Sequence, residues 1–202
     1  IAIPAGLQNA IFGFANLFIQ IGVNSFDASM VVANSAASNS DPLVYNIMSA
    51  FYVACSTFIG QNYGAEKKSR VLKSYFISLA CSFCFALFLG ILLFIFGRNF
   101  ISIFISDSAI IELGMRRLSI MAFSYCISAF MDCTIAASRG LGQTSVPTVI
   151  VILGSCVFRI AWIFSVFAYF KTIESLYLLF AFSWTITAVA EIFYFARLYK
   201  QK

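Results

Sequence analysis

The chain has 202 residues, of which 61% are hydrophobic, only 10% are charged and none is histidine. Soluble globular domains carry roughly a quarter charged residues, so this composition excludes a soluble domain and predicts an all-α integral membrane protein. The net charge of +5 comes from basic residues beside the hydrophobic stretches and does not indicate a nucleic-acid partner.

Six hydrophobic stretches follow one another along the chain, and each is long enough to cross a bilayer as a helix, which takes about 20 residues. They cover approximately residues 4–28, 42–63, 71–97, 114–138, 145–170 and 174–197. They predict a bundle of six transmembrane helices that forms a single domain over residues 1–202. The chain starts at Ile1 without a polar lead-in. We expect it to be a fragment or one excised lobe, with a self-sufficient six-helix protein as the alternative.

The first stretch carries polar side chains along one face of an otherwise apolar helix. At about 100° per residue, Asn9, Asn16, Gln20, Asn24 and Asp27 fall on the same face. Amides at bilayer depth are costly unless they contact protein or water. The stripe therefore predicts either a substrate or ion pathway, with the four amide residues as its candidates, or hydrogen bonds that hold neighbouring helices together.

The second stretch places Tyr45, Ser49, Tyr52 and Ser56 on one helical face. An aromatic ring in a membrane cavity attracts an organic cation through the cation–π interaction. We predict that Tyr52 lines the cavity, whereas Tyr45 is expected to belong to the interfacial aromatic belt.

Asp132 is the sharpest candidate for chemistry in the fourth stretch. It precedes Arg139, at the end of the helix, by seven residues or roughly 10 Å, and it shares a face with Tyr125 and Ser128. A charged carboxylate at this depth is costly, so it suits a substrate or ion pathway in which a proton or cation binds during transport. The alternative is a structural salt bridge or an interhelical hydrogen bond.

Arg159 lies near the middle of the fifth stretch, where insertion of a charge costs about 2.5 to 3.5 kcal/mol. We predict an ion pair of Arg159 with Glu191 or with Asp132, because these are the acids expected inside the membrane. A structural role for Arg159 and Glu191 is favoured over a role in transport.

Basic residues are unevenly divided between the two ends of the predicted helices. The end that holds both termini has eight, namely Lys67, Lys68, Arg70, Lys73, Arg139, Arg197, Lys200 and Lys202. The opposite end has four, namely Arg98, Arg116, Arg117 and Lys171. The positive-inside rule therefore predicts cytoplasmic termini, in a multi-pass protein of the plasma (inner) membrane.

The sequence contains no known catalytic or metal-binding pattern. It has no histidine, no G-x-S-x-G nucleophile motif and no Walker-type phosphate loop, so we expect neither an enzyme nor ATP hydrolysis. Cys81 and Cys84 have a C-x-x-C spacing, but their surroundings are apolar and no second ligand pair exists. We interpret the six cysteines as helix-packing residues and predict no metal site.

Several segments resemble motifs of one transporter family. The string T-F-I-G-Q-N-Y-G-A at residues 57–65 resembles the T-F-x-G-Q-N-x-G-A signature of the multidrug and toxic compound extrusion (MATE) family. Residues 4–9 resemble the start of that family's seventh helix, and residues 138–147 resemble its R-G-x-G-x-T-x-x-P turn after the tenth helix. Residues 156–160 are similar to its eleventh helix. The matches follow the family's order, and the resemblance covers the whole chain.

This resemblance implies that the chain is the C-terminal six-helix lobe of a twelve-helix transporter whose N-terminal lobe is missing. It implies a secondary active antiporter without a bound cofactor, which exports cationic amphipathic compounds in exchange for Na⁺ or H⁺ by rocking of two lobes about a central cavity. The alternatives are a lipid-linked oligosaccharide flippase of the same superfamily and a non-transporting assembly subunit. Some family members carry an acidic ligand in the seventh helix, but residues 9–20 contain none. The coupling ion is therefore expected at Asp132 or in the missing lobe.

Overall fold

Helices make up nearly the whole chain in the computed structural model, which describes the backbone of residues 2–202 and the side chains of residues 11–202. The first predicted stretch forms α1, Ala2–Asn24, and ends before residue 28. Asp27 lies outside α1, because its side chain accepts a hydrogen bond from the Met30 amide at 2.9 Å and caps the next helix.

The second helical segment starts earlier than predicted. Helices α2, Ala28–Ser38, and α3, Ser40–Gly64, run almost end to end. The predicted stretch 42–63 corresponds to α3 to within two residues, whereas α2 was not predicted. The residues of α2 are mostly small or polar, and they lie between the first two predicted stretches. In the fold, however, α2 packs against α5, Ser108–Gly140, and Ala33 and Ala37 are fully buried. Small side chains permit this close helix contact.

The remaining helices match the predicted stretches to within several residues. Helix α4 spans Lys68–Ser102 and α9 spans Ile173–Gln201. The fifth stretch changes its winding and consists of α6 (Ser145–Val151), the π-helical η1 (Ile152–Val157), α7 (Phe158–Trp162), the π-helical η2 (Ile163–Phe167) and α8 (Ala168–Phe170). Within the described residues, five helical segments are long and apolar enough to cross a membrane, and α1 adds a shorter apolar helix. The predicted all-α fold of six membrane helices is confirmed.

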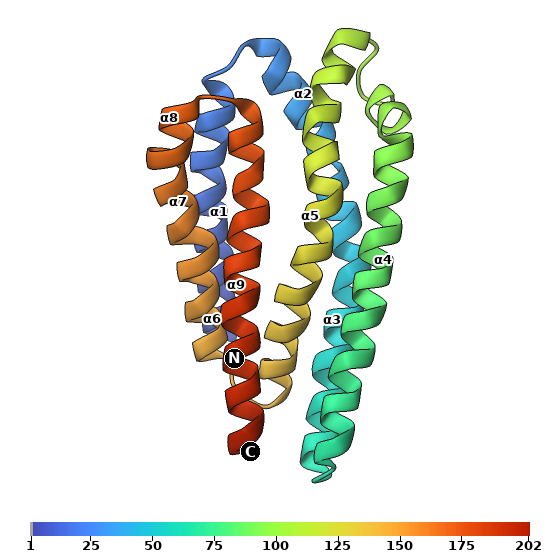
Figure 1. Cartoon of the computed structure of the whole chain (residues 1–202), viewed down its shortest axis with the longest axis vertical. Coiled ribbons are helices and arrows are strands. Elements are labelled where there is room, and N and C mark those ends of the chain that lie inside the picture. The colour runs from blue at the N-terminus through green and yellow to red at the C-terminus, as the bar shows by residue number, and fades with distance from the viewer. Residues whose placement is uncertain (1) are drawn as a thin grey trace.

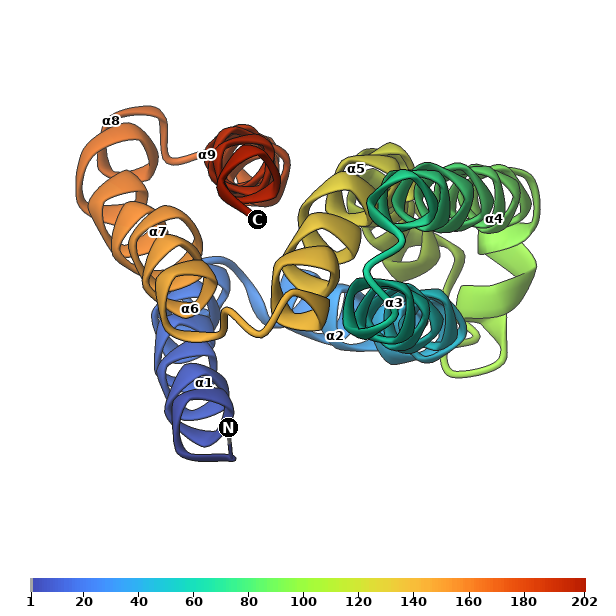
Figure 2. The ribbon, with the colours of Figure 1, turned by 90° about the horizontal axis from the view of Figure 1, so that it is seen from below.

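The helices form two groups, which Figure 2 shows from the end of the bundle. One group contains α3, α4 and α5, and the other contains α1, α9 and the segment from α6 to α8 (Figure 1). Helix α5 packs along α3 and α4 and also along α9, so the α5–α9 contact is the main connection between the groups.

The group of α3, α4 and α5 has the larger apolar core. Met48 and Ile59 of α3 pack there with Met121 of α5, and Cys55 and Cys133 are buried in the same cluster. The approach of α4 to α5 is so close that a Cβ atom at Gly90 would overlap the carbonyl oxygen of Ala122. Only glycine allows this contact.

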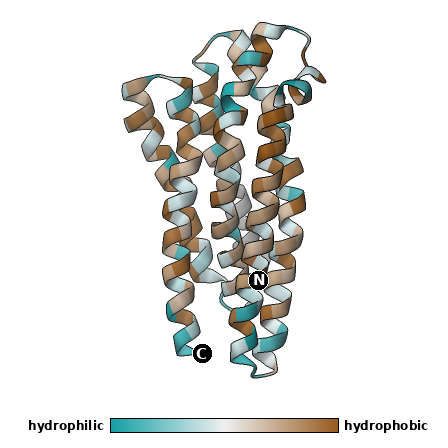
Figure 3. Ribbon diagram, turned by 45° about the vertical axis from the view of Figure 1, so that its right-hand side comes forward, coloured by the Kyte–Doolittle hydropathy of each residue, from teal (hydrophilic) through white to brown (hydrophobic). Residues whose placement is uncertain are grey.

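The connections divide between the two ends of the bundle. Both termini and the turn between α3 and α4 lie at the lower end in Figure 1, and the α1–α2, α4–α5 and α8–α9 connections lie at the upper end. Figure 3 shows hydrophilic residues gathered toward the ends and hydrophobic residues along most of the helix length. The basic turn at Lys67 and Lys68 is therefore at the same end as the termini, as the sequence predicts.

Candidate functional site

A cavity of about 570 Å³ lies between the two groups of helices. Helices α1, α7 and α9 contribute one wall, and α3 and α5 contribute the other. Most of the lining is apolar, and the polar and charged lining residues are Asn16, Asp41, Tyr45, Tyr125, Ser128, Asp132 and Arg159. A mainly apolar cavity with a few polar groups is typical of a site for an organic ligand.

Helix α5 supplies much of the polar wall. Tyr125, Ser128 and Asp132 recur every three or four residues, so they lie on the helical face that lines the cavity. The Ser128 hydroxyl donates to the Tyr125 carbonyl oxygen at 2.9 Å. The structure thus brings together the three residues that the sequence selects in this helix. Asp132 is half-buried, and within the described residues it forms no ion pair.

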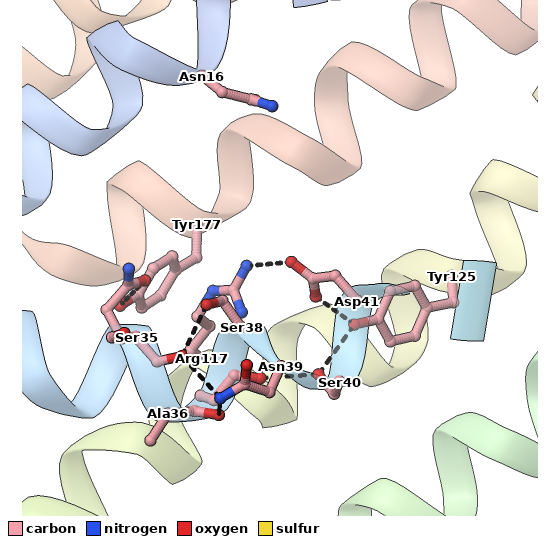
Figure 4. A network of polar contacts seen from close by, with 12 residues as sticks. Asn16, Ser35, Ala36, Ser38, Asn39, Ser40, Asp41, Arg117, Tyr125 and Tyr177 are labelled. Carbon is pink, nitrogen blue, oxygen red and sulfur yellow. Dashed lines mark hydrogen bonds and ion pairs between the residues drawn. The ribbon is translucent and has the colours of Figure 1, made fainter. Parts of the chain in front are cut away.

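An ion pair of the buried Arg117 with the half-buried Asp41 lies in the cavity wall, near the junction of α2 and α3. Nη2 of Arg117 and the hydroxyl of Tyr125 each donate to the Asp41 carboxylate at 2.5 Å. The Ser40 hydroxyl lies 3.2 Å from that of Tyr125. Figure 4 shows Asp41 between Arg117 and Tyr125, with Asn16 projecting from α1 on the other side of the space. The pair neutralises Asp41 and joins the start of α3 to α5.

Tyr177 extends this network to α9. Its ring lies 5.9 Å from the guanidinium carbon of Arg117, and its hydroxyl donates to the Asn34 side-chain oxygen at 3.1 Å. Arg117 therefore connects α5 with α3 and α9, and Tyr177 continues the network to α2.

Neither Asp41 nor Arg117 was among the sequence candidates, because both map to the outer end of the predicted helices. One feature of the sequence could have indicated Arg117. Arg117 precedes Tyr125 by eight residues and so lies on the same face of α5 as Tyr125 and Asp132. Its partner Asp41 is 76 positions away along the chain, and no local pattern indicates that contact.

Arg159 of α7 stands on the other wall with only neutral partners. Its side chain is almost fully buried, and its Nε donates to the Ser183 hydroxyl at 3.2 Å. Its Nη1 donates to the Asn16 side-chain oxygen at 3.5 Å. Three aromatic rings, those of Phe12, Phe180 and Trp184, have centroids between 4.7 and 6.0 Å from the guanidinium carbon.

The predicted ion pair of Arg159 with Asp132 or Glu191 is wrong, because neither carboxylate contacts the guanidinium. Glu191 is eight residues beyond Ser183 on α9, which is roughly 12 Å along the helix. It is 0% exposed, and neither of its carboxylate oxygens has a hydrogen-bond partner within the described residues. Glu191 is not a lining residue of the cavity.

The amide stripe of α1 is divided by the fold. Asn16 lines the cavity, whereas Gln20 donates to the Asn24 side-chain oxygen at 2.8 Å on the exposed surface of α1. Buried residues such as Ala15 occupy the opposite face of the helix. The side chain of Asn9 lies outside the described residues.

Of the two tyrosines in the second stretch, Tyr52 does not line the cavity as predicted, whereas Tyr45 does. Tyr52 is buried in the apolar core of α3, α4 and α5 and is not a lining residue of the cavity. Tyr45, expected at the membrane interface, contributes to the cavity wall.

Comparison with known proteins gives one family. A family model described as MatE matches residues 4–164 of this chain. A probable multidrug resistance protein NorM of Thermotoga maritima is 26% identical over 178 residues, which cover 85% of this chain and 37% of the relative. A protein of Shewanella oneidensis named FAD transporter is 30% identical over 112 residues, which cover 55% of this chain and 25% of that relative.

Solved structures give the same result for the fold. The chain superimposes on a multidrug resistance MATE family transporter of the MOP superfamily, in its outward-facing conformation, with a TM-score of 0.90 and 14% identity. The superposition covers 100% of this chain and 46% of the transporter chain. The chain thus spans less than half the length of the relatives that it matches.

Proposed function

The chain belongs to the MatE family, the multidrug and toxic compound extrusion family that its motifs resemble, and we propose that it forms the C-terminal six-helix lobe of a secondary active antiporter. The proposed cargo is a cationic amphipathic compound, exported in exchange for Na⁺ or H⁺. The proposed partner is an N-terminal lobe. Coverage of 46% of a similar transporter chain supports this division into lobes.

The cavity carries the proposal, because it combines an unpaired acid with aromatic surfaces. Asp132 lines it without an ion pair, whereas Asp41 is already neutralised by Arg117. Asp132 is therefore the available acid for a coupling proton or sodium ion. Oxygen atoms of Tyr125 and Ser128 lie on the same face of α5, where they can help to hold a cation or its water.

The amides of α1 divide between two parts of the proposed pathway. Asn16 belongs to the cavity of this lobe. Gln20 and Asn24 lie on an exposed face of α1, and we assign them, with Asn9, to the cleft shared with the second lobe. A polar face at membrane depth is stable if it faces water or protein.

The two helix groups offer a mechanical basis for transport. They are connected mainly through α5 and α9, and the cavity lies between them. Small displacements of the α1 and α6–α8 helices would change access to Asp132 while the α3–α5 core stays intact. Rocking of the two lobes would then complete alternating access.

The proposed orientation has cytoplasmic termini in the plasma (inner) membrane. Support comes from the basic residues Lys67 and Lys68, which lie at the same end of the bundle as both termini. An excess of Lys and Arg marks the cytoplasmic side of multi-pass proteins.

Transport by the full-length protein in proteoliposomes tests the proposal. We expect an imposed Na⁺ or proton gradient to drive accumulation of a fluorescent organic cation, and an ionophore to abolish it. Asp132→Asn should remove the coupling. The matched control is Asp107→Asn, because Asp107 is the exposed N-cap of α5 and asparagine caps a helix equally well. Transport whose rate does not depend on a Na⁺ gradient or on a proton gradient would rule out the antiporter.

A further inference from the structure

We propose that Arg159 binds the anionic group of an aromatic substrate, most simply a carboxylate, inside the cavity of this lobe. The inference rests on the proposed transport function. It assigns the place in the cavity that would hold an anionic group of the cargo, and it gives Arg159 a role in recognition in addition to the structural one expected from sequence.

The guanidinium is a buried positive charge that the fold leaves without a counter-ion. Arginines inside membranes usually pair with acids or mark the path of a substrate. The ion pairs within the described residues involve other groups, namely Arg98 with Glu112, Arg116 with Glu174 and Arg117 with Asp41. Arg159 has instead the hydroxyl of Ser183 and the amide oxygen of Asn16, which are weaker partners than a carboxylate.

The geometry suits an aromatic acid. Arg159 lines the cavity, and Ser183 and Asn16 hold its Nε and Nη1, so Nη2 remains available for a ligand oxygen. A planar guanidinium binds a carboxylate through parallel hydrogen bonds. The rings of Phe180 and Trp184 lie beside it and line the same cavity, where they can pack against an aromatic body.

The backbone around Arg159 is wound unusually. The short α7 that carries it lies between the π-helical η1 and η2. Such turns are rare, and they occur frequently at functional sites, because the wider winding rotates side chains away from their regular positions. Arg159 here reaches both α9 and the cavity.

The charge balance of the cavity favours a carboxylate-bearing ligand. Asp41 and Arg117 neutralise each other, which leaves Asp132 and Arg159 as the unpaired lining charges within the described residues. A ligand with only a positive charge would satisfy Asp132 and leave Arg159 without a counter-ion. A carboxylate on the same ligand satisfies Arg159 as well.

Equilibrium binding of two matched probes to the purified full-length protein tests this assignment. The probes are a rhodamine with a free carboxylate and its methyl ester, which has the same aromatic body and no anionic group. We expect Arg159→Gln to weaken binding of the carboxylate probe by about tenfold or more and that of the ester by less than about threefold. The control Arg116→Gln removes an exposed arginine that does not line the cavity, and it should change neither.

A second variant keeps Arg159 and supplies it with an internal counter-ion. Asn16→Asp places a carboxylate where the amide oxygen now accepts from Nη1 at 3.5 Å. It should cause the same selective loss of the carboxylate probe, and it serves if Arg159→Gln does not fold. Equal weakening of both probes, or of neither, would overturn the assignment. If the probes are weakened equally, or not at all, while gradient-driven transport is intact, only the role of Arg159 is contradicted. If binding is selective but no transport occurs, only the antiporter is contradicted.

Discussion

Arg117 and Arg159 are buried to nearly the same extent, with 4% and 3% of their surface exposed, yet their surroundings are opposite. Arg117 is neutralised by Asp41, whose second oxygen is held by Tyr125. Arg159 has a hydroxyl, an amide and aromatic rings around it, and within the part of the chain that the structure describes it has no acid as an ion-pair partner. A buried charge with its own counter-ion is needed by the fold, because its loss leaves the partner uncompensated, whereas a buried charge without one is available to a ligand.

The two regions also differ in backbone. Arg117 lies in the regular helix α5, which packs closely along α3 and α4. Arg159 lies between two π-helical turns in the segment that connects mainly to α1 and α9. The rigid region fixes the shape of the cavity, and the irregular region presents the unpaired charge.

Loss of Arg117 should have the largest effect on stability. Arg117→Gln leaves the Asp41 carboxylate without its counter-ion, and breaking a buried pair costs about 3 to 5 kcal/mol. Because the Asp41 side chain is 35% exposed, we expect the lower end of that range. Thermal unfolding of the purified protein in detergent measures it. Arg159→Gln is the matched variant, and it should lower stability by about 1 kcal/mol, less than Arg117→Gln, since neutral hydrogen-bond partners are lost and no acid loses its counter-ion. Equal destabilisation by both variants would contradict the proposed difference between Arg117, which has a counter-ion, and Arg159, which has none within the described residues.

Tyr125→Phe should have the next largest effect. The substitution removes the hydroxyl that donates to Asp41 at 2.5 Å and keeps the ring. A hydrogen bond to a charged group contributes about 1.5 to 3 kcal/mol, and the partial exposure of Asp41 again favours the lower value. The melting temperature reports the loss. The same variant in an Arg117→Gln background should cost less, because both residues act on one carboxylate. Additive losses would show that the two residues act independently.

Ser183→Ala tests the neutral partners of Arg159. It removes the hydroxyl that accepts from Nε at 3.2 Å and donates to the Phe180 carbonyl oxygen of the same helix at 3.1 Å. We expect a loss of about 1 kcal/mol, mainly from the bond to Arg159. Ser165 is a suitable control, because its hydroxyl bonds only to the preceding turn of its own helix and is exposed. Ser165→Ala should leave the melting temperature almost unchanged. A loss at Ser183 as large as that of Arg117→Gln would mean that Arg159 is as firmly held as Arg117.

Glu191→Gln should have the smallest effect. The carboxyl group is fully buried without a hydrogen-bond partner, so the charged form would be uncompensated there and a neutral amide of the same shape fits equally well. We expect a change within about 0.5 kcal/mol, or a slight gain in stability. A large loss of stability, measured by the same unfolding assay, would reveal a partner for Glu191 outside the described residues.

The six-helix fold was predictable, because apolar stretches of the required length are interrupted by polar turns such as the one at Gly64. The start of the second helical segment at Ala28 was not predicted. Residues 33–41 are small or polar, and their helical state depends on packing of Ala33 and Ala37 against α5.

For the site, local periodicity was informative and long-range pairing was not. The spacing of Tyr125, Ser128 and Asp132 correctly placed them on one face toward the cavity. The partner of Arg117 depends on contacts between distant segments, and the absence of an acid beside Arg159 depends on the same contacts. The chain has 24 phenylalanines in total. Composition could not show that Phe12 and Phe180 are the ones that lie beside Arg159.

A structure of the full-length protein with the carboxylate rhodamine bound tests most directly that Arg159 is available to a ligand. We predict the ligand carboxylate within hydrogen-bond distance of the Arg159 guanidinium, with the Arg117–Asp41 pair unchanged. A protein carboxylate paired with Arg159, from this lobe or from elsewhere in the transporter, with the ligand bound at another place, would contradict the account.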